Sequence, residues 1–305
     1  QMHLCQTTCL ITRFGTLSID CLQLYFGQCL LGVNHSQTFL MLTGAAGAGK
    51  STLANIIEGI IGRQNCTELR LEHMNNRFEM NRLIGKTLLT GKDVPAHFLN
   101  TRGAQKLKAL TGKDTLTTEA KGRNETVDIV GEFNIIITSN SDLQVHVDGD
   151  NEAWRRRMLW IKYELLSDIE KIDAFDELLL QEEGAGILNW GIEGACRLLK
   201  NKGQIQRSEN HSLRVDELLQ ESDSAAAFID TCVVKATGES VTSEALYTAY
   251  LDFCRARDWE AKEYRNACRG FRSAIEAKFH LSYRHDIPAG NGYVRRGYVG
   301  IKIRS

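Results

Sequence analysis

Residues 44–51 read Gly44-Ala45-Ala46-Gly47-Ala48-Gly49-Lys50-Ser51, and they follow directly on the apolar run 38–42. They match the phosphate-loop pattern G-x-x-x-x-G-K-S/T, in which glycines let successive backbone N–H groups converge on one point. The apolar run predicts a buried strand, and residues 51–61 predict an amphipathic helix whose N-terminus adds partial positive charge to the loop. In this context the pattern predicts a nucleoside triphosphate site, with a flexible glycine loop as the alternative.

Within this stretch two side chains carry the expected chemistry. Lys50 is predicted to reach the β- and γ-phosphates, and the hydroxyl of Ser51 is predicted to ligate Mg²⁺. The predicted nucleotide-binding residues are Gly44, Ala45, Ala46, Gly47, Ala48, Gly49, Lys50, Ser51 and Thr52.

The composition is that of an ordinary globular protein. The chain has 305 residues, of which 43% are hydrophobic and 25% charged, enough for one large core or two domains. The net charge of −1 conceals a basic tail, since residues 264–305 hold nine Lys and Arg residues against two Asp and Glu residues. Such a tail favours a nucleic-acid partner, with a solvated basic surface as the alternative.

The cysteines and apolar stretches bear on the cellular environment. Nine cysteines show no C-x-x-C pair and no Cys/His spacing of a zinc site, so we expect free thiols in a reducing cytoplasm. No apolar stretch reaches the roughly 18–20 residues of a membrane span, and we recognise no signal peptide. We therefore expect a cytoplasmic protein with no membrane partner. Because the chain begins with Gln1, we expect it to be a fragment of something longer.

Apolar runs alternate with helical patterns after the phosphate loop. The strand-like runs are residues 86–90, 133–138 and 158–161. This alternation predicts an α/β fold, a parallel sheet with helices on both faces. Because ligands of open α/β sheets bind beyond the carboxyl ends of the strands, we expect the phosphate loop, Asp93 and Asn140 to meet there.

The expected organisation has five parts. They are a helical lead-in at residues 1–36, an ATPase-type core at 37–165, a helical closing segment at 166–205, a polar linker at 206–223 and a small domain at 224–305. The closing segment is expected to contain two helices separated by a break at Glu182-Glu183-Gly184.

The small domain predicts a winged helix-turn-helix, in which three helices are closed by a basic hairpin. Its helices are expected at residues 224–234, 243–257 and 263–280, and its strands at 281–285 and 293–303.

A nucleotide hydrolase also needs a carboxylate, a γ-phosphate sensor and an arginine that neutralises charge in the transition state. Asp93 follows the run 86–90 and is the candidate carboxylate, with a surface-turn Asp as the alternative. Asn140 follows the run 133–138 and is the candidate sensor, with a turn-forming Asn as the alternative. Three arginines at 155–157 precede the last strand-like run, where a neighbouring subunit could receive one of them, although adjacent arginines commonly form a solvated face.

A basic hairpin is the last candidate feature. Residues 115–118 and 126–130 are expected to pair, with Lys121, Gly122 and Arg123 at the tip. A basic tip suits a nucleic-acid phosphate backbone, although basic turns are common.

In this order the motifs resemble the superfamily 3 helicase domain of the phage and plasmid primase–helicase family, a branch of the AAA+ ATPases. The resemblance covers roughly residues 23–200, and the tail resembles the family's winged-helix end more weakly. The segments that carry it are residues 44–51, 76–78, 83–86, 110–114, 137–140, 154–157 and 184–194.

The resemblance implies a P-loop AAA+-type parallel sheet with helices on both faces, followed by a small winged-helix-like α+β domain. It also implies an ATP-dependent DNA helicase that translocates on single-stranded DNA through a homo-oligomeric ring, expected to be a hexamer, with ATP at subunit interfaces. The host would be a bacterium or a phage-infected cell, and an upstream primase domain or origin DNA would be a further partner.

By position, the resemblance assigns roles to single residues. The catalytic set is Lys50, Asp93, Asn140 and an arginine finger, with Arg157 as first choice and Arg156 as second. Mg²⁺ would be held by Ser51 and Asp93, and DNA by Lys113, Lys121 and Arg123. The chain departs from the family at one point, since it has Lys92-Asp93 where the family commonly has Glu or Asp-Glu.

Two alternatives remain open. One is an ATP-switched origin-binding or helicase-loading protein with slow hydrolysis and no unwinding. The other is a monomeric small-molecule kinase that is indifferent to DNA.

Overall fold

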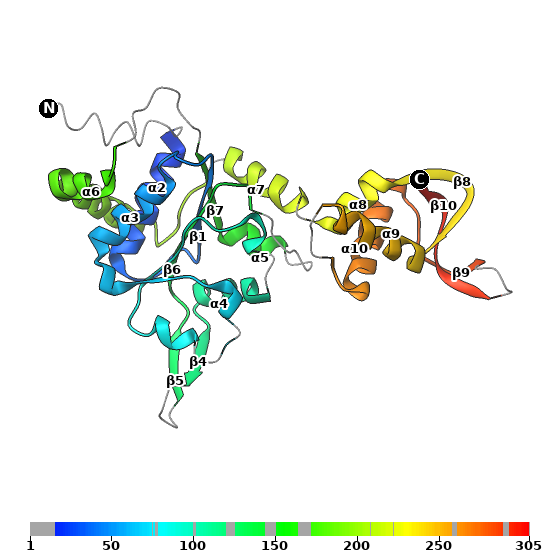
Figure 1. Cartoon of the computed structure of the whole chain (residues 1–305), viewed down its shortest axis with the longest axis horizontal. Coiled ribbons are helices and arrows are strands. Elements are labelled where there is room, and N and C mark those ends of the chain that lie inside the picture. The colour runs from blue at the N-terminus through cyan, green and yellow to red at the C-terminus, as the bar shows by residue number, and fades with distance from the viewer. Residues whose placement is uncertain are drawn as a thin grey trace. The chain divides into compact units, whose positions relative to one another are not determined.

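The computed structural model describes residues 16–74, 76, 79–99, 102–119, 126–143, 151–163, 172–207, 209–221, 223–257, 261–288 and 293–304 (Figure 1). These residues form two compact units, the first reaching to Val215 and the second built mainly from Asp216 onward. None of the described helices combines the length and apolar composition that a membrane span requires. The seven described cysteines are free thiols, as expected.

The first unit is an α/β structure. Its helices and strands are α2 (Thr16–Leu31), β1 (Phe39–Gly44), α3 (Lys50–Ile61), β2 (Cys66–Glu68), β3 (Leu88–Gly91), α4 (Lys106–Thr111), β4 (Thr115–Glu119), β5 (Thr126–Val130), β6 (Asn134–Ser139), α5 (Asn151–Arg157), β7 (Met158–Tyr163), α6 (Phe175–Lys200) and the start of α7 (Glu209–Glu221). Single turns of 3-10 helix lie at Arg63–Asn65, Leu71–His73, Glu79–Leu83, Ala96–Phe98 and Arg102–Gln105.

Five parallel strands form the central sheet in the order β2-β3-β6-β1-β7. The four strand-like runs of the sequence all appear in it, which confirms the predicted fold class. Strand β2 was not predicted, because it has only three residues and none of them is buried. Since β6 lies between β1 and β3, the loops that follow these three strands are neighbours at one edge of the sheet.

Helices cover both faces of this sheet. Successive side chains of a strand point to opposite faces, and in a buried parallel strand both sets are apolar and need cover. Leu40 and Leu42 of β1 belong to the apolar cluster that also contains α2, α3 and α6. Phe39 lies on the opposite face, where its ring contacts Trp154 of α5 edge-on at 6.1 Å. Helix α2 is part of this core, because the Tyr25 hydroxyl donates to Ile135 O at 2.6 Å and accepts from Ile135 N at 2.9 Å.

Helix α6 is continuous over 26 residues, so the break predicted at residues 182–184 is wrong. A glycine costs a helix about 1 kcal/mol, and tertiary packing outweighs that cost here. Gly194 faces α2 so closely that a Cβ atom there would lie 2.1 Å from Gln23 O. Gly194 therefore allows close packing of α6 against α2, and none of the glycines of α6 ends the helix.

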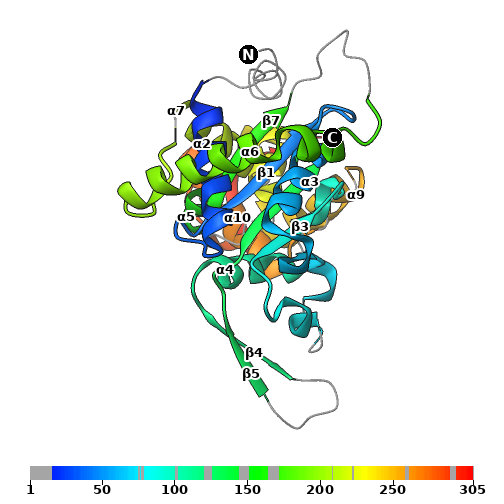
Figure 2. The same ribbon diagram turned by 90° about the vertical axis from the view of Figure 1, so that its left-hand side faces the viewer.

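The predicted hairpin is confirmed for its described part. Strands β4 and β5 pair antiparallel from Thr115–Val130 to Glu119–Thr126 and extend away from the sheet (Figure 2). Lys121 and Arg123, predicted at the tip, lie outside the described residues.

The second unit has a winged-helix-like α+β fold, as predicted. It consists of α8 (Ser224–Cys232), β8 (Val233–Thr242), α9 (Ser243–Arg255), α10 (Tyr264–Phe279), β9 (Arg284–Pro288) and β10 (Val294–Ile303). The antiparallel sheet has the order β8-β10-β9. Strand β8 was missed because its middle is polar and exposed, with apolar buried residues only near its two ends.

The linker predicted at residues 206–223 contains a helix. Helix α7 spans Glu209–Glu221, and the boundary between the two units falls inside it, between Val215 and Asp216. A polar stretch predicts exposure, but a polar helix satisfies that prediction as well as a loop does.

Gly194→Ala and Gly184→Ala form a matched pair of variants on α6. We expect Gly194→Ala to lower the free energy of unfolding by about 1–3 kcal/mol, because the added Cβ must displace the α2 backbone. We expect Gly184→Ala to raise it by about 0.5–1 kcal/mol, because a Cβ there meets no atom within 4 Å and alanine favours the helix. Urea unfolding followed by circular dichroism measures both, and equal stabilities would contradict the close α2–α6 packing.

Candidate functional site

The loop between β1 and α3 has the backbone that its glycines allow. Gly44 has a φ of +133°, and a Cβ atom there would lie 2.1 Å from Tyr163 O on β7. Gly49 has a φ of 90° in the left-handed region, and α3 begins at the next residue. The loop therefore leads directly into a helix N-terminus, whose first N–H groups have no partner within the helix and suit an anion.

Lys50 is the first residue of α3, and its side chain turns back to the carbonyl groups of this loop. Its side chain is only 3% exposed, and its Nζ donates to Gly44 O at 2.8 Å, to Ala45 O at 2.7 Å and to Asn140 Oδ1 at 3.0 Å. Burial lowers the pKa of Lys50, and the charge of Asp93 partly offsets that effect. Because the three acceptors are neutral, an anion bound in the loop would offer the ammonium group a stronger partner.

Ser51 and Asp93 meet beside Lys50. The Ser51 hydroxyl donates to Asp93 Oδ1 at 3.5 Å, a long contact between two oxygen atoms. Neighbouring ligands of a six-coordinate Mg²⁺ are about 3 Å apart, so a small shift would let both atoms ligate one ion. The described residues contain no group of three His, Cys, Asp or Glu side chains that could hold a metal. A divalent cation here would therefore also need oxygen atoms from a ligand.

The turn that carries Asp93 is fixed by strand β6. Asp93 has a φ of 51°, and its backbone N–H donates to Thr138 Oγ1 at 2.9 Å. The next N–H, of Val94, donates to Thr138 O at 2.9 Å. Thr138 thus holds the turn beside the strand end that presents Asn140.

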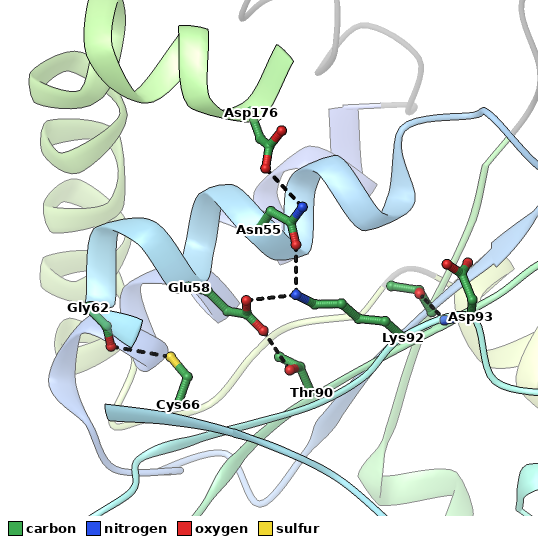
Figure 3. Close-up of polar contacts among 9 residues, drawn as sticks. Asn55, Glu58, Gly62, Cys66, Thr90, Lys92, Asp93 and Asp176 are labelled. Carbon is green, nitrogen blue, oxygen red and sulfur yellow. Dashed lines mark hydrogen bonds and ion pairs between the residues drawn. The ribbon is translucent and has the colours of Figure 1, made fainter. Parts of the chain in front are cut away.

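Lys92 precedes Asp93 in the sequence, but its side chain points toward α3 and away from Asp93 (Figure 3). Its Nζ lies 2.7 Å from Glu58 Oε2 and 2.7 Å from Asn55 Oδ1, both on α3. Glu58 also accepts a hydrogen bond from Thr90 at 2.6 Å. The Lys92 charge is therefore balanced by Glu58, and it leaves the Asp93 carboxylate directed toward Ser51.

The three arginines of α5 differ in exposure. Arg157 is 6% exposed, and its guanidinium donates to Ala153 O at 3.2 Å. Arg155 and Arg156 are exposed, and Arg155 pairs with Glu152 at 2.8 Å. An arginine finger would have to reach a neighbouring subunit, and the exposed Arg156 suits that role better than the buried Arg157 does.

Two further polar residues of the first unit are Lys113, which was predicted as a site residue, and Asp142, which was not. Lys113, predicted to contact DNA, is exposed and sits beside the base of the hairpin, where its N–H donates to Gly131 O at 2.8 Å. Asp142 was missed, although it follows the same strand as Asn140. It accepts from the Thr43 hydroxyl at 3.2 Å and pairs with Lys162 at 2.7 Å.

Two further residues were missed because they lie about fifty positions from their partners. Arg207 donates to Arg155 O at 2.6 Å and to Arg156 O. His211 accepts from Trp160 N at 2.9 Å, on the edge strand β7. Burial, together with Arg207 and Arg214, lowers the pKa of His211 to about 4, so it is a neutral acceptor at pH 7.

Comparisons with known proteins give one family model and several solved structures. A family model described as a family of unknown function, DUF5906, matches residues 42–157, the range that contains the phosphate loop, Asp93, Asn140 and the three arginines. No curated protein matches the chain. The apo structure of the NrS-1 C-terminal region (305-718) is similar with a TM-score of 0.52 and 12% identity, over 96% of this chain and 74% of that one. A JCV helicase structure with a bound acetamide compound matches with a TM-score of 0.36 and 16% identity, over 68% and 61%. The NrS-1 likeness shows a shared fold.

Asp93→Asn and Asp142→Asn compare two carboxylates at the same edge of the sheet. We expect Asp93→Asn to weaken Mg²⁺-dependent ATP binding at least about tenfold, because it removes a charged ligand next to Ser51. We expect Asp142→Asn to change it less than about threefold, because Asp142 is engaged with Lys162. Titration calorimetry with and without Mg²⁺ measures both. A larger effect of Asp142→Asn would place the cation elsewhere.

Proposed function

We propose that this chain is an ATP-dependent DNA helicase that translocates on single-stranded DNA through a homo-oligomeric ring, a hexamer, in the replication of a phage, plasmid or other mobile element. The observation that carries the proposal is the meeting of Lys50, Ser51, Asp93 and Asn140 at the carboxyl edge of one parallel sheet. Each has the chemistry that its place in a nucleotide hydrolase requires.

The proposed binding step exchanges partners at Lys50. Its ammonium group leaves the two loop carbonyls and binds phosphate oxygens, while the N–H groups of the loop and of the first turn of α3 bind the rest of the phosphate chain. Ser51 and Asp93 would hold Mg²⁺, which would supply positive charge to neutralise the phosphate oxygens. Asn140 already accepts from Lys50 through Oδ1, so its Nδ2 is left to donate to the γ-phosphate or to the attacking water.

We assign the alignment of the attacking water to Asp93 as well. Glu58 on α3 also lies beside β3, but Thr90 and Lys92 hold its two oxygens. If Asp93 both binds Mg²⁺ and aligns the attacking water, we expect slower hydrolysis than two separate acidic residues would give. That observation favours the second candidate function, an ATP-switched origin-binding or helicase-loading protein, which would hydrolyse ATP slowly and displace no strand.

The proposal requires an oligomer, because the arginine finger of one subunit acts in the nucleotide site of the next. Arg156 is exposed on α5, so it would neutralise transition-state charge in the site of a neighbouring subunit. DNA contact is assigned to the β4–β5 hairpin, with Lys113 near its base and Lys121 and Arg123 in the segment between its strands.

ATP hydrolysis with and without single-stranded DNA, over a protein concentration series, tests the proposed function. We expect a rate per subunit that rises with both, and we expect Lys50→Ala to abolish it, while Lys162→Ala, a control lysine at the same sheet edge, retains it. Strand displacement separates the two candidates. Hydrolysis that is independent of DNA and of concentration would contradict the helicase proposal and favour a monomeric nucleotide-dependent enzyme.

Mixed subunits test the trans finger. Lys50→Ala subunits keep Arg156, and Arg156→Ala subunits keep an intact nucleotide site, so we expect a mixture of the two inactive variants to recover hydrolysis. A mixture of Lys50→Ala with Asp93→Asn should not recover, because both changes damage the same site. Full activity of Arg156→Ala alone would show that another arginine acts.

A further inference from the structure

Arg207 caps the helix that carries the three arginines. Its guanidinium donates to Arg155 O at 2.6 Å and to Arg156 O, two carbonyls of the last turn of α5. A helix leaves the carbonyls of its last turn without partners in the helix. A cation at this end also interacts favourably with the negative end of the helix dipole. Burial lowers the pKa of Arg207, yet a guanidinium stays charged at any working pH.

Helix α5 depends on such outside contacts. It has seven residues, and helices this short are not stable alone. Trp154 anchors one side of it, since its ring is fully buried and lies edge-on to Phe39. Trp154 and Arg157 are buried and hold one side of α5. The side chains of Arg155 and Arg156 are exposed, and Arg207 binds the backbone carbonyls of these two residues.

The segment that carries Arg207 is itself bound to the first unit at two further points. Gln206 O accepts from Cys21 Sγ at 3.1 Å, and His211 binds the backbone of β7, which follows α5 directly. Helix α7 begins two residues after Arg207 and continues into the second unit (Figure 1). Arg207 therefore joins the start of α7 to the end of α5.

We propose that Arg207 is a positioning residue for the arginine finger: it holds the carbonyls of Arg155 and Arg156 so that the Arg156 side chain is presented to the neighbouring subunit. The inference rests on the proposed function, because the finger matters only if the chain hydrolyses ATP at shared sites. The described hydrogen bonds of Arg207 go to two carbonyls of α5, so we expect its effect on hydrolysis to pass through that helix.

Arg207→Ala is the direct test. We expect kcat for ATP to fall about 10- to 100-fold, because a catalytic group displaced by about 1 Å can lose that much. The KM for ATP should stay within about twofold, since the subunit's own phosphate loop is unchanged. Arg207→Lys keeps the charge but loses the two-donor geometry, so we expect an intermediate kcat. Arg197→Ala removes an arginine bound to Asp20 and Gln23 on α2, which has no hydrogen bond to α5 among the described residues, and should leave kcat unchanged.

Mixed subunits distinguish positioning from a general loss of structure. Arg207→Ala subunits should recover hydrolysis when mixed with Lys50→Ala subunits, which provide a well-placed finger, and should not recover with Arg156→Ala subunits. A wild-type kcat for Arg207→Ala, or no recovery with Lys50→Ala while the Arg156→Ala mixture recovers, would overturn the inference and leave the proposed function intact. Absence of hydrolysis by the wild-type chain would overturn both.

Discussion

Strand β6, paired between β1 and β3, is the constraint on which the rest of the candidate site depends. The pairing sets Thr138 beside Leu42 of β1, and Gly91 of β3 beside Ile137. Thr138 then binds two successive N–H groups of the Asp93 turn, and Asn140, two residues further on, binds Lys50. A slip of one residue in this register would turn the side chains of β6 to the opposite face and separate Asn140 from the phosphate loop.

The second constraint on the candidate site is the balance of charge around its lysines. Lys50 and Lys92 both lie near the carboxyl edge of the sheet, and their charges have different surroundings. Lys92 forms an ion pair with Glu58, so its charge is compensated within the protein. Lys50 is almost completely buried among neutral oxygens, an arrangement that is costly for a cation and becomes favourable when an anion arrives. This contrast explains why the loop at Lys50 is suited to bind phosphate while the neighbouring basic residue is not available to it.

Local patterns in the sequence predicted most of the fold, and long-range contacts explain the remainder. The phosphate loop, the four apolar strands and the β4–β5 hairpin each have a signal within about ten residues. The continuity of α6 depends on Gly194 facing the α2 backbone, and α2 lies about 170 positions away. The burial of Arg157 likewise follows from packing, because three adjacent arginines look equivalent in the sequence. Arg207 and His211 carry no local pattern, and only the folded chain brings them to α5 and β7. The sequence therefore predicted that Lys50, Ser51, Asp93 and Asn140 lie close together, and it did not predict the contacts that support them.

A structure of the protein with Mg²⁺ and a non-hydrolysable ATP analogue tests the central claim most directly. The account predicts that Lys50 Nζ leaves Gly44 O and Ala45 O and contacts phosphate oxygens. It also predicts one cation bound to both Ser51 Oγ and an Asp93 carboxylate oxygen. A triphosphate bound elsewhere, with Lys50 still bonded to the two loop carbonyls, would contradict the account.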